Sequence, residues 1–149
     1  MTAIGLGLHQ NAIRGIIEKG ECQVQAPGLD LTNHNKGSLI IPFHHDLGMI
    51  TVHGKSRFPA LYGWDSQWRR YQPRAPEDHF LINTSRQLEW ITGGYIKEFY
   101  HEAYFGDDTA AAKQKAIEEK RSLWRVASTF FTHIEGDKIL APLEAFRTP

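Results

Sequence analysis

Two short apolar segments separated by a turn-forming tripeptide constrain the fold of this chain more than any other feature. SLIIPF (38–43) and MITVH (49–53) are rich in β-branched and aromatic residues, and DLG (46–48) between them is a compact turn signal. The two segments are therefore predicted to pair as an antiparallel hairpin. The hairpin is unusual because it also carries three histidines and an aspartate.

Helical periodicity dominates the second half of the chain. Residues 84–104 begin with the capping pattern TSRQ, and residues 109–132 follow an aspartate and carry apolar residues at helical spacing. A short helix at 9–19, a second at 65–71 and strands at 21–25 and 79–83 complete the expected elements. This order predicts an α+β fold: a small antiparallel sheet of about four short strands, covered on one face by two long C-terminal helices plus a short N-terminal helix.

Composition limits the class of protein. The chain has 149 residues and 41% hydrophobic content, which is typical of a single domain, 1–149, with one core. Lys and Arg number 17, as do Asp and Glu, so the formal charge is zero and any attraction to an anion needs a local group. One cysteine and no 18-residue apolar stretch predict a cytoplasmic protein without a membrane segment.

The register of the hairpin decides what its histidines can do. If Leu47 and Gly48 alone form the turn, His44, Asp46 and His53 share the polar face. His44 and His53 are then diagonal neighbours, roughly 7 Å apart at the backbone, and both rings can reach one ligand atom. A three-residue DLG turn with a bulge is the alternative, and it separates the two histidines.

Three functional hypotheses follow from this face. In the first, His44 and His53 are the catalytic acid and base on a phosphorylated ligand, nucleic acid or a nucleotide, with Lys55 and Arg57 as phosphate contacts. In the second, His44, Asp46 and His53 bind Zn²⁺ or Fe²⁺ in a metal-dependent enzyme. In the third, protonated histidines only bind an anion. Against all three stands a structural explanation, in which the rings are solvated or bonded to backbone carbonyls. No organic cofactor is predicted.

An aromatic and basic segment follows the hairpin directly. Rings interleaved with arginines suit stacking on bases and pairing with phosphate. The predicted ligand-binding residues of this segment are Tyr62, Trp64, Trp68 and Arg69. The same composition suits a short helix packed on the core, or a protein-binding surface, because Trp, Tyr and Arg dominate interface hot spots. A non-catalytic interaction module, an inhibitor or accessory subunit, is therefore the alternative; the oligomeric state is not predicted.

A second histidine-containing pattern lies in the predicted helix at 84–104. Glu98 and His101 form a Glu-x-x-His pair, which dinuclear metal proteins use on helices. Such sites require a second copy of the pattern and further glutamates, and the chain has neither. We therefore expect Glu98 and His101 to lie on a solvated helix face.

Overall fold

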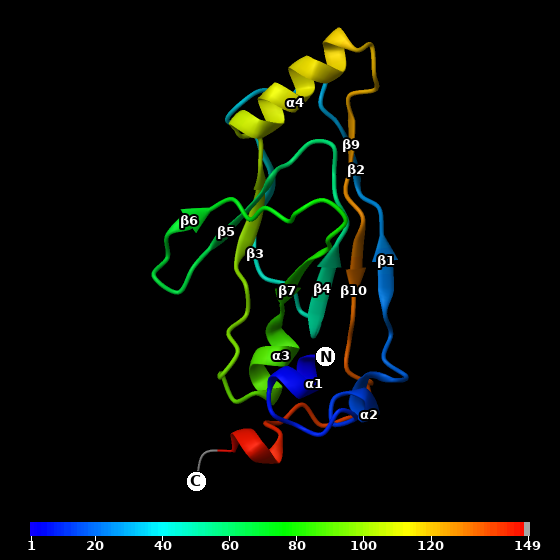
Figure 1. Ribbon diagram of the computed structural model, residues 1–149, viewed down its shortest axis with the longest axis vertical. Helices are drawn as coiled ribbons and strands as arrows, with labels where there is room; N and C mark the ends of the chain where they lie inside the picture. The colour runs from blue at the N-terminus through cyan, green and yellow to red at the C-terminus, as the bar shows by residue number, and fades with distance from the viewer. Residues whose placement is uncertain (148–149) are drawn as a thin grey trace.

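The fold consists mainly of short antiparallel strands. The structure, a computed structural model, describes residues 1–147 (Figure 1). One four-stranded sheet has the order β1 (Gln23–Gln25), β10 (Thr129–Phe131), β4 (Ile50–His53), β7 (Leu81–Thr84). A second has the order β3 (Leu39–His44), β8 (His101–Tyr104), β5 (Leu61–Trp64), β6 (Arg70–Tyr71). A two-stranded sheet pairs β2 (Gly28–Asp30) with β9 (Trp124–Val126). This is a jelly-roll-like arrangement.

Helices are short in the part of the chain that the structure describes. They are α1 (Thr2–Gly5), α2 (Arg14–Ile17), α3 (Arg86–Ile91), α4 (Asp107–Glu118) and the 3₁₀ helix η1 (Glu144–Phe146). In Figure 1, α1 to α3 lie at one end of the molecule and α4 lies at the other. None of these helices is long and apolar enough to cross a membrane.

The predicted α+β fold with two long C-terminal helices is wrong. Residues 84–104 form only the six-residue α3 before the chain reaches β8, and residues 109–132 contain most of α4, then β9 and β10. Gly93 and Gly94 both have positive φ, of 56° and 82°, which no α-helix accommodates. In the second segment, the helical pattern is real as far as Glu118, and Lys120 with φ of 51° then turns the chain into the strands.

The predicted hairpin is also wrong, although both of its strands exist. β3 pairs with β8, whereas β4 pairs with β10 and β7, so the tripeptide 46–48 carries the chain from one sheet to the other. β3 is irregular, with register shifts between Leu39 and Ile41 and between Ile41 and His44. Because of these irregularities, Ile41 and His44, three residues apart, both face the space between the sheets.

The predicted helix at 65–71 is replaced by a β-hairpin. β5 and β6 pair antiparallel, and Asp65 organises the connection by accepting hydrogen bonds from the backbone N–H groups of Gln67 and Arg69. Trp68 lies in the left-handed region with φ of 60°. Asp65 and Arg69 form an ion pair at 2.7 Å, which links the two ends of this turn.

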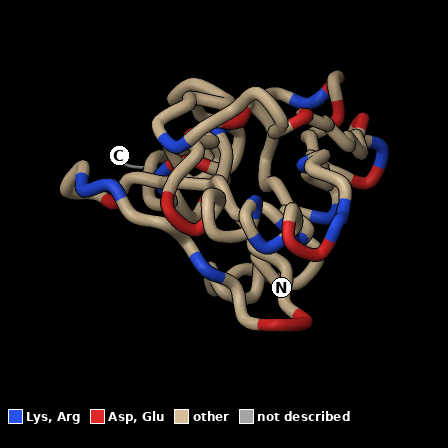
Figure 2. Tube along the Cα trace, turned by 90° about the horizontal axis from the view of Figure 1, so that it is seen from above, with Lys and Arg blue, Asp and Glu red and all other residues tan. Residues whose placement is uncertain are grey.

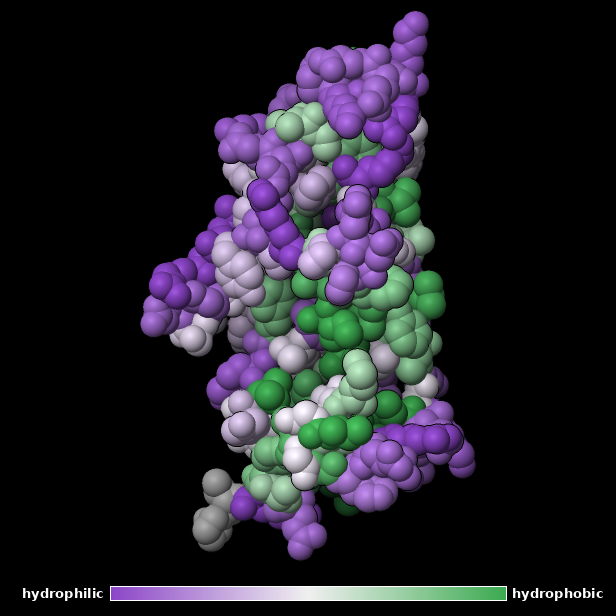
Figure 3. All heavy atoms as spheres, viewed as in Figure 1, coloured by the Kyte–Doolittle hydropathy of each residue, from purple (hydrophilic) through white to green (hydrophobic). Residues whose placement is uncertain are grey.

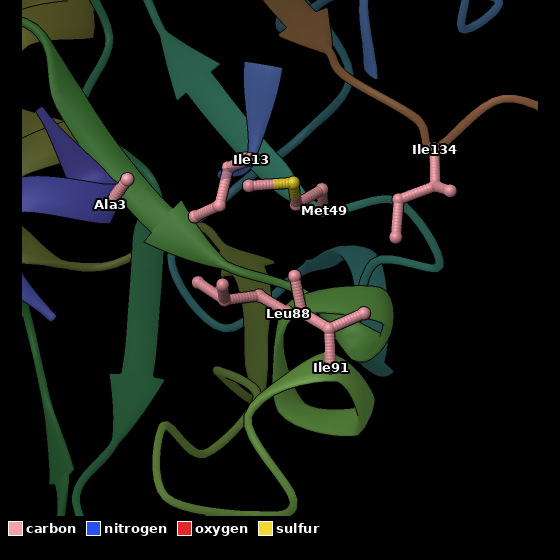
Figure 4. Close-up of a cluster of buried hydrophobic side chains, with 6 residues drawn as sticks. All are labelled: Ala3, Ile13, Met49, Leu88, Ile91 and Ile134. Carbon is pink, nitrogen blue, oxygen red and sulfur yellow. The ribbon is translucent and has the colours of Figure 1, made fainter. Parts of the chain in front are cut away.

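Two apolar clusters lie at opposite ends of the molecule. The first joins α1, α3 and the chain around them and comprises Ala3, Ile13, Met49, Leu88, Ile91 and Ile134 (Figure 4). The second lies under α4 and comprises Leu31, Phe58, Phe105 and Ala116. The space between the two sheets lies between these clusters, so neither cluster fills it.

A row of apolar side chains crosses the outer face of the β1-β10-β4-β7 sheet. Val24 is opposite Phe130, Phe130 is opposite Val52, and Val52 is opposite Ile82. Val24 and Ile82 are mostly exposed, and Figure 3 shows hydrophobic atoms gathered over this part of the molecule. Charged residues are distributed differently: acidic and basic positions are interspersed along the chain (Figure 2).

Gly63 allows β5 to approach the segment before β8. A Cβ atom at this position would lie 2.0 Å from the Phe99 ring, which is itself stacked on His101 at 5.4 Å between ring centroids. We expect Gly63→Ala to lower the free energy of unfolding by about 1–3 kcal/mol, the usual effect of overpacking. Chemical denaturation measures it. Gly15→Ala is the control, because a Cβ there meets nothing within 4 Å; equal stability of the two variants would contradict the packing described.

Candidate metal centre

A cavity of about 590 Å³ lies between the two four-stranded sheets. Side chains from both sheets line it, including His44 and His101 from one sheet and His53 and Phe131 from the other. Its apolar wall is formed by Ile41, Pro59, Ala60, Leu61, Leu81, Ala103, Ala127 and Phe131. A predominantly apolar cavity with a few converging polar groups is the usual form of a ligand site.

Three side chains in this cavity converge as metal ligands do. His44 ends β3, His101 begins β8, and the two residues are opposite each other in the register of that strand pair. Asp46 follows two residues after His44 at the start of the crossing to β4. One ligand atom from each of the three lies within 4.8 Å of the other two. The Asp46 Oδ1 atom is 3.7 Å from His44 Nε2 and 3.8 Å from His101 Nε2.

The Asp46 carboxylate is fixed in orientation by its neighbours. Its Oδ2 atom accepts hydrogen bonds from the Thr51 hydroxyl at 2.6 Å and from the Asn83 amide at 3.1 Å. Asp46 is buried, as are Thr51 and Asn83. With Oδ2 occupied in this way, Oδ1 is the oxygen that faces the two histidines. A ligand carboxylate held by outer hydrogen bonds is typical of protein metal sites.

Burial favours the ligating form of the His101 ring. The side chain is 5% exposed, and this burial lowers the pKa of the His101 imidazole, partly opposed by the negative charge of Asp46. A lowered pKa favours the neutral ring at pH 7, and the neutral ring is the form that binds a metal. The Nδ1 atom of His101 lies 3.2 Å from the carbonyl oxygen of Phe99, which leaves Nε2 for the cavity.

Arg125 is a buried cation on the wall of the same cavity. Residue exposure is 8%, and desolvation lowers the pKa of the guanidinium. Its Nε donates to the carbonyl oxygen of Phe58 at 3.2 Å, which orients the side chain. Within residues 1–147, no carboxylate lies within ion-pairing distance of Arg125. A buried charge without a counter-ion is costly, so an anionic ligand in the cavity would be strongly favoured at this position.

The structure brings only some of the predicted site residues together. His44 and Asp46 are in the three-residue cluster, whereas the third ligand expected with them, His53, is not. His53 lies across the cavity on β4, where its ring centroid is 6.1 Å from that of His101. Its Nε2 atom is 2.6 Å from the Asn83 side-chain oxygen. The catalytic role expected of His44 and His53 stays a prediction.

The predicted phosphate contacts lie near the cavity. Lys55 lines it and is 3.6 Å from Glu77, and the Arg57 guanidinium donates to the Ser122 carbonyl oxygen. A second, smaller cavity of about 290 Å³ is lined by both Lys55 and Arg57, and Arg57 does not line the main cavity. Arg125, which sequence reasoning did not single out, is the buried cation of the main cavity.

The predicted stacking residues do not line the main cavity. Trp64 and Trp68 pack on Phe43, with ring centroids at 4.7 and 6.4 Å, and Arg69 pairs with Asp65. Tyr62 stacks against the Arg70 guanidinium at 4.0 Å. The short helix packed on the core, which was the alternative to ligand binding, does not form, and Trp68 is mostly exposed; the ligand-binding role of these residues stays a prediction.

His101 was missed because its segment was expected to be helical. The signals that could have found it are Gly93 and Gly94, which interrupt a helix, and the aromatic residues of HEAYF (101–105), which suit a strand. Together with the His-x-Asp spacing of His44 and Asp46, a histidine at the start of a later strand completes a two-histidine, one-carboxylate set. That donor set, with open positions, is the one that non-haem Fe²⁺ oxygenases use. The residues present therefore fit a divalent iron.

Comparison with solved structures extends this interpretation. No protein-family model and no curated protein sequence matches the chain. A full-length Neurospora crassa protein in complex with alpha-KG matches with a TM-score of 0.76 and 15% identity, over 99% of this chain and 47% of that one. The dioxygenase for auxin oxidation 1 from Arabidopsis thaliana, bound to 2-oxoglutarate, matches with a TM-score of 0.78 and 16% identity, over 98% and 49%. A putative 2OG-Fe(II) oxygenase family protein from Caulobacter crescentus matches with a TM-score of 0.75 and 17% identity, over 98% and 44%.

The chain shares the fold of these solved structures. It spans about half the length of the solved structures that it matches. The fold overturns the expectation of a nucleic-acid-binding hydrolase, because the structures that share it include oxygenases of this class. Among the three hypotheses from the sequence, the findings favour the metal-dependent enzyme with a His/Asp site. The expected partner, nucleic acid or another protein, stays a prediction.

Proposed function

We propose that this chain forms the catalytic core of an Fe²⁺- and 2-oxoglutarate-dependent oxygenase. The observation that carries the proposal is the convergence of His44, Asp46 and His101 in a cavity that also holds the unpaired, buried Arg125. The shared fold supports it, since the solved structures with this fold include two bound to alpha-KG or 2-oxoglutarate.

Each residue of the cavity has a distinct role in this proposal. His44, Asp46 and His101 hold Fe²⁺ through two nitrogens and one oxygen, and leave the remaining positions open. Arg125 binds a carboxylate of 2-oxoglutarate, and this carboxylate is the counter-charge that the protein does not provide for the buried guanidinium. Bound Fe²⁺ supplies the redox chemistry for the reaction with O₂.

The apolar wall defines what else enters the cavity. Ile41, Leu61 and Ala103 come from three adjacent strands of one sheet, and Phe131 faces them from the other. Apolar walls exclude water from the neighbourhood of the metal and favour a substrate with a hydrophobic portion. We therefore propose a small organic substrate that is oxidised next to His44 and His101.

Oxygen consumption tests the proposed activity directly. With Fe²⁺ and 2-oxoglutarate both present, the chain is expected to consume O₂ faster than with either alone, because the proposed reaction requires both. An oxygen electrode measures the rate. The control is the same protein with Mg²⁺ in place of Fe²⁺, which has no accessible redox change and should be inactive. Oxygen uptake that is independent of 2-oxoglutarate would contradict the proposed cosubstrate.

A further inference from the structure

Asn83 connects the metal cluster to a histidine that lies outside it. It is a buried residue on β7, 5% exposed, and is directly opposite Thr51 in the register of β4 and β7. Its amide nitrogen is 3.1 Å from Asp46 Oδ2, and its amide oxygen is 2.6 Å from His53 Nε2. One side chain thus contacts both a ligand carboxylate and the imidazole on the opposite wall.

The chemistry of the Asn83 amide group determines which atoms carry hydrogen in its contacts with Asp46 and His53. An ionised carboxylate only accepts hydrogen bonds, so the Asn83 NH₂ group must face Asp46. The Asn83 carbonyl oxygen therefore faces His53, and since a carbonyl oxygen only accepts, His53 Nε2 must carry the hydrogen. In the neutral ring, Nδ1 is then the nitrogen with the free lone pair.

The free nitrogen of His53 is open to a ligand. Within the described chain, no residue forms a hydrogen bond to His53 Nδ1. Because His53 Nδ1 has no hydrogen-bond partner among the described residues and is not buried, it is accessible to solvent. His53 is a lining residue of the main cavity.

We propose that Asn83 is a positioning residue of the metal centre. Its NH₂ group directs Oδ1 of Asp46 towards the two histidines, and its carbonyl oxygen holds His53 as the Nε2–H tautomer, with Nδ1 as a hydrogen-bond acceptor in the cavity. A ligand beside His53 must therefore offer an O–H or N–H donor. The proposal rests on the proposed function, since it assumes that Asp46 binds a metal.

Metal affinity tests the first part of the proposal. In Asn83→Leu, which keeps the volume but removes both hydrogen bonds, we expect Mn²⁺ to bind roughly 10- to 100-fold more weakly, the usual effect of losing an outer partner of a ligand. Calorimetric titration of the metal-free full chain measures it. Asn83→Ser is the second variant in case leucine prevents folding. Thr84→Val is the matched control, since its hydroxyl bonds the Lys97 carbonyl oxygen away from the cluster.

The tautomer of His53 tests the second part without any variant. Nitrogen NMR of the metal-free protein with ¹⁵N-labelled histidine is expected to show His53 with its proton on Nε2, and Asn83→Leu is expected to lose this preference. A purely structural role for Asn83 would not fix the tautomer. A proton on Nδ1 in the wild-type protein would overturn the proposal.

The outcomes separate this proposal from the proposed function. If the wild-type chain binds Mn²⁺ and both Asn83 variants, correctly folded by circular dichroism, bind it equally well, Asn83 does not position Asp46 and the inference fails. If the wild-type chain itself binds no divalent metal, the metal centre fails, whatever the tautomer of His53.

Discussion

Alanine at any one of His44, Asp46 or His101 is expected to weaken Fe²⁺ binding by more than about 100-fold and to abolish 2-oxoglutarate-dependent O₂ consumption. The ligand atoms of these residues converge within 4.8 Å, so removal of one leaves an incomplete donor set. Residues that merely support a ligand contribute about 10- to 100-fold to metal affinity, so a ligand itself should contribute more. Anaerobic titration calorimetry with Fe²⁺ measures the affinity of each variant.

His45 provides a matched control for this prediction. It lies between two of the ligands in sequence, yet its Nε2 accepts a hydrogen bond from Arg86 at 2.9 Å, and its ring packs on Tyr100 outside the cavity. His45→Gln retains a side-chain acceptor for Arg86 and should bind Fe²⁺ as the wild-type chain does. The assignment of ligands would be contradicted if His45→Gln lost the metal while His44→Ala kept it.

Arg125→Met is expected to lose most of the affinity for 2-oxoglutarate while Fe²⁺ still binds. The guanidinium is buried, oriented by the carbonyl oxygen of Phe58, and has no carboxylate partner in residues 1–147. Loss of one partner from a buried, hydrogen-bonded charge pair costs about 2–5 kcal/mol, or roughly 30-fold or more in affinity. Calorimetric titration of 2-oxoglutarate into the Mn²⁺-loaded variant measures the change.

Two further variants make this test specific. Arg125→Lys keeps the charge but loses the fork of donors, so it should recover only part of the affinity. Arg57→Met removes a cation that lines only the smaller cavity, and it should leave 2-oxoglutarate binding unchanged. Equal loss in Arg57→Met and Arg125→Met would show that general positive charge, and not the buried guanidinium, attracts the cosubstrate.

The sequence predicted individual β segments far better than it predicted their partners. Strands were expected within 38–43, 49–53 and 79–83; β4 lies inside its range, and β3 and β7 each extend one residue beyond theirs. The first two segments, 38–43 and 49–53, were expected to pair as a hairpin because one register placed their apolar residues on one face. In the structure both strands have different partners, and β3 contains two irregularities that no alternation rule anticipates. Strand order in a two-sheet fold depends on long-range contacts that local pattern does not encode.

The same limitation explains why the site was only half predicted. Of the three residues expected to bind a metal, His44 and Asp46 lie in the cluster with His101, whereas His53 does not. His101 could not be added, because its segment was expected to form a helix with Glu98. In the structure Glu98 is instead ion-paired with Arg86, and β8 places His101 opposite His44. Arg125 was hidden in the same way, inside residues expected to be helical.

Anaerobic titration with 2-oxoglutarate tests whether the cavity binds both Fe²⁺ and this cosubstrate. 2-Oxoglutarate is titrated into the full chain under anaerobic conditions, once without metal and once with one equivalent of Fe²⁺. We expect one Fe²⁺ and one 2-oxoglutarate per chain, with tighter 2-oxoglutarate binding when Fe²⁺ is present, because both occupy the cavity lined by His44, Asp46, His101 and Arg125. A chain that binds no Fe²⁺, or whose affinity for 2-oxoglutarate is the same with and without it, would contradict the account.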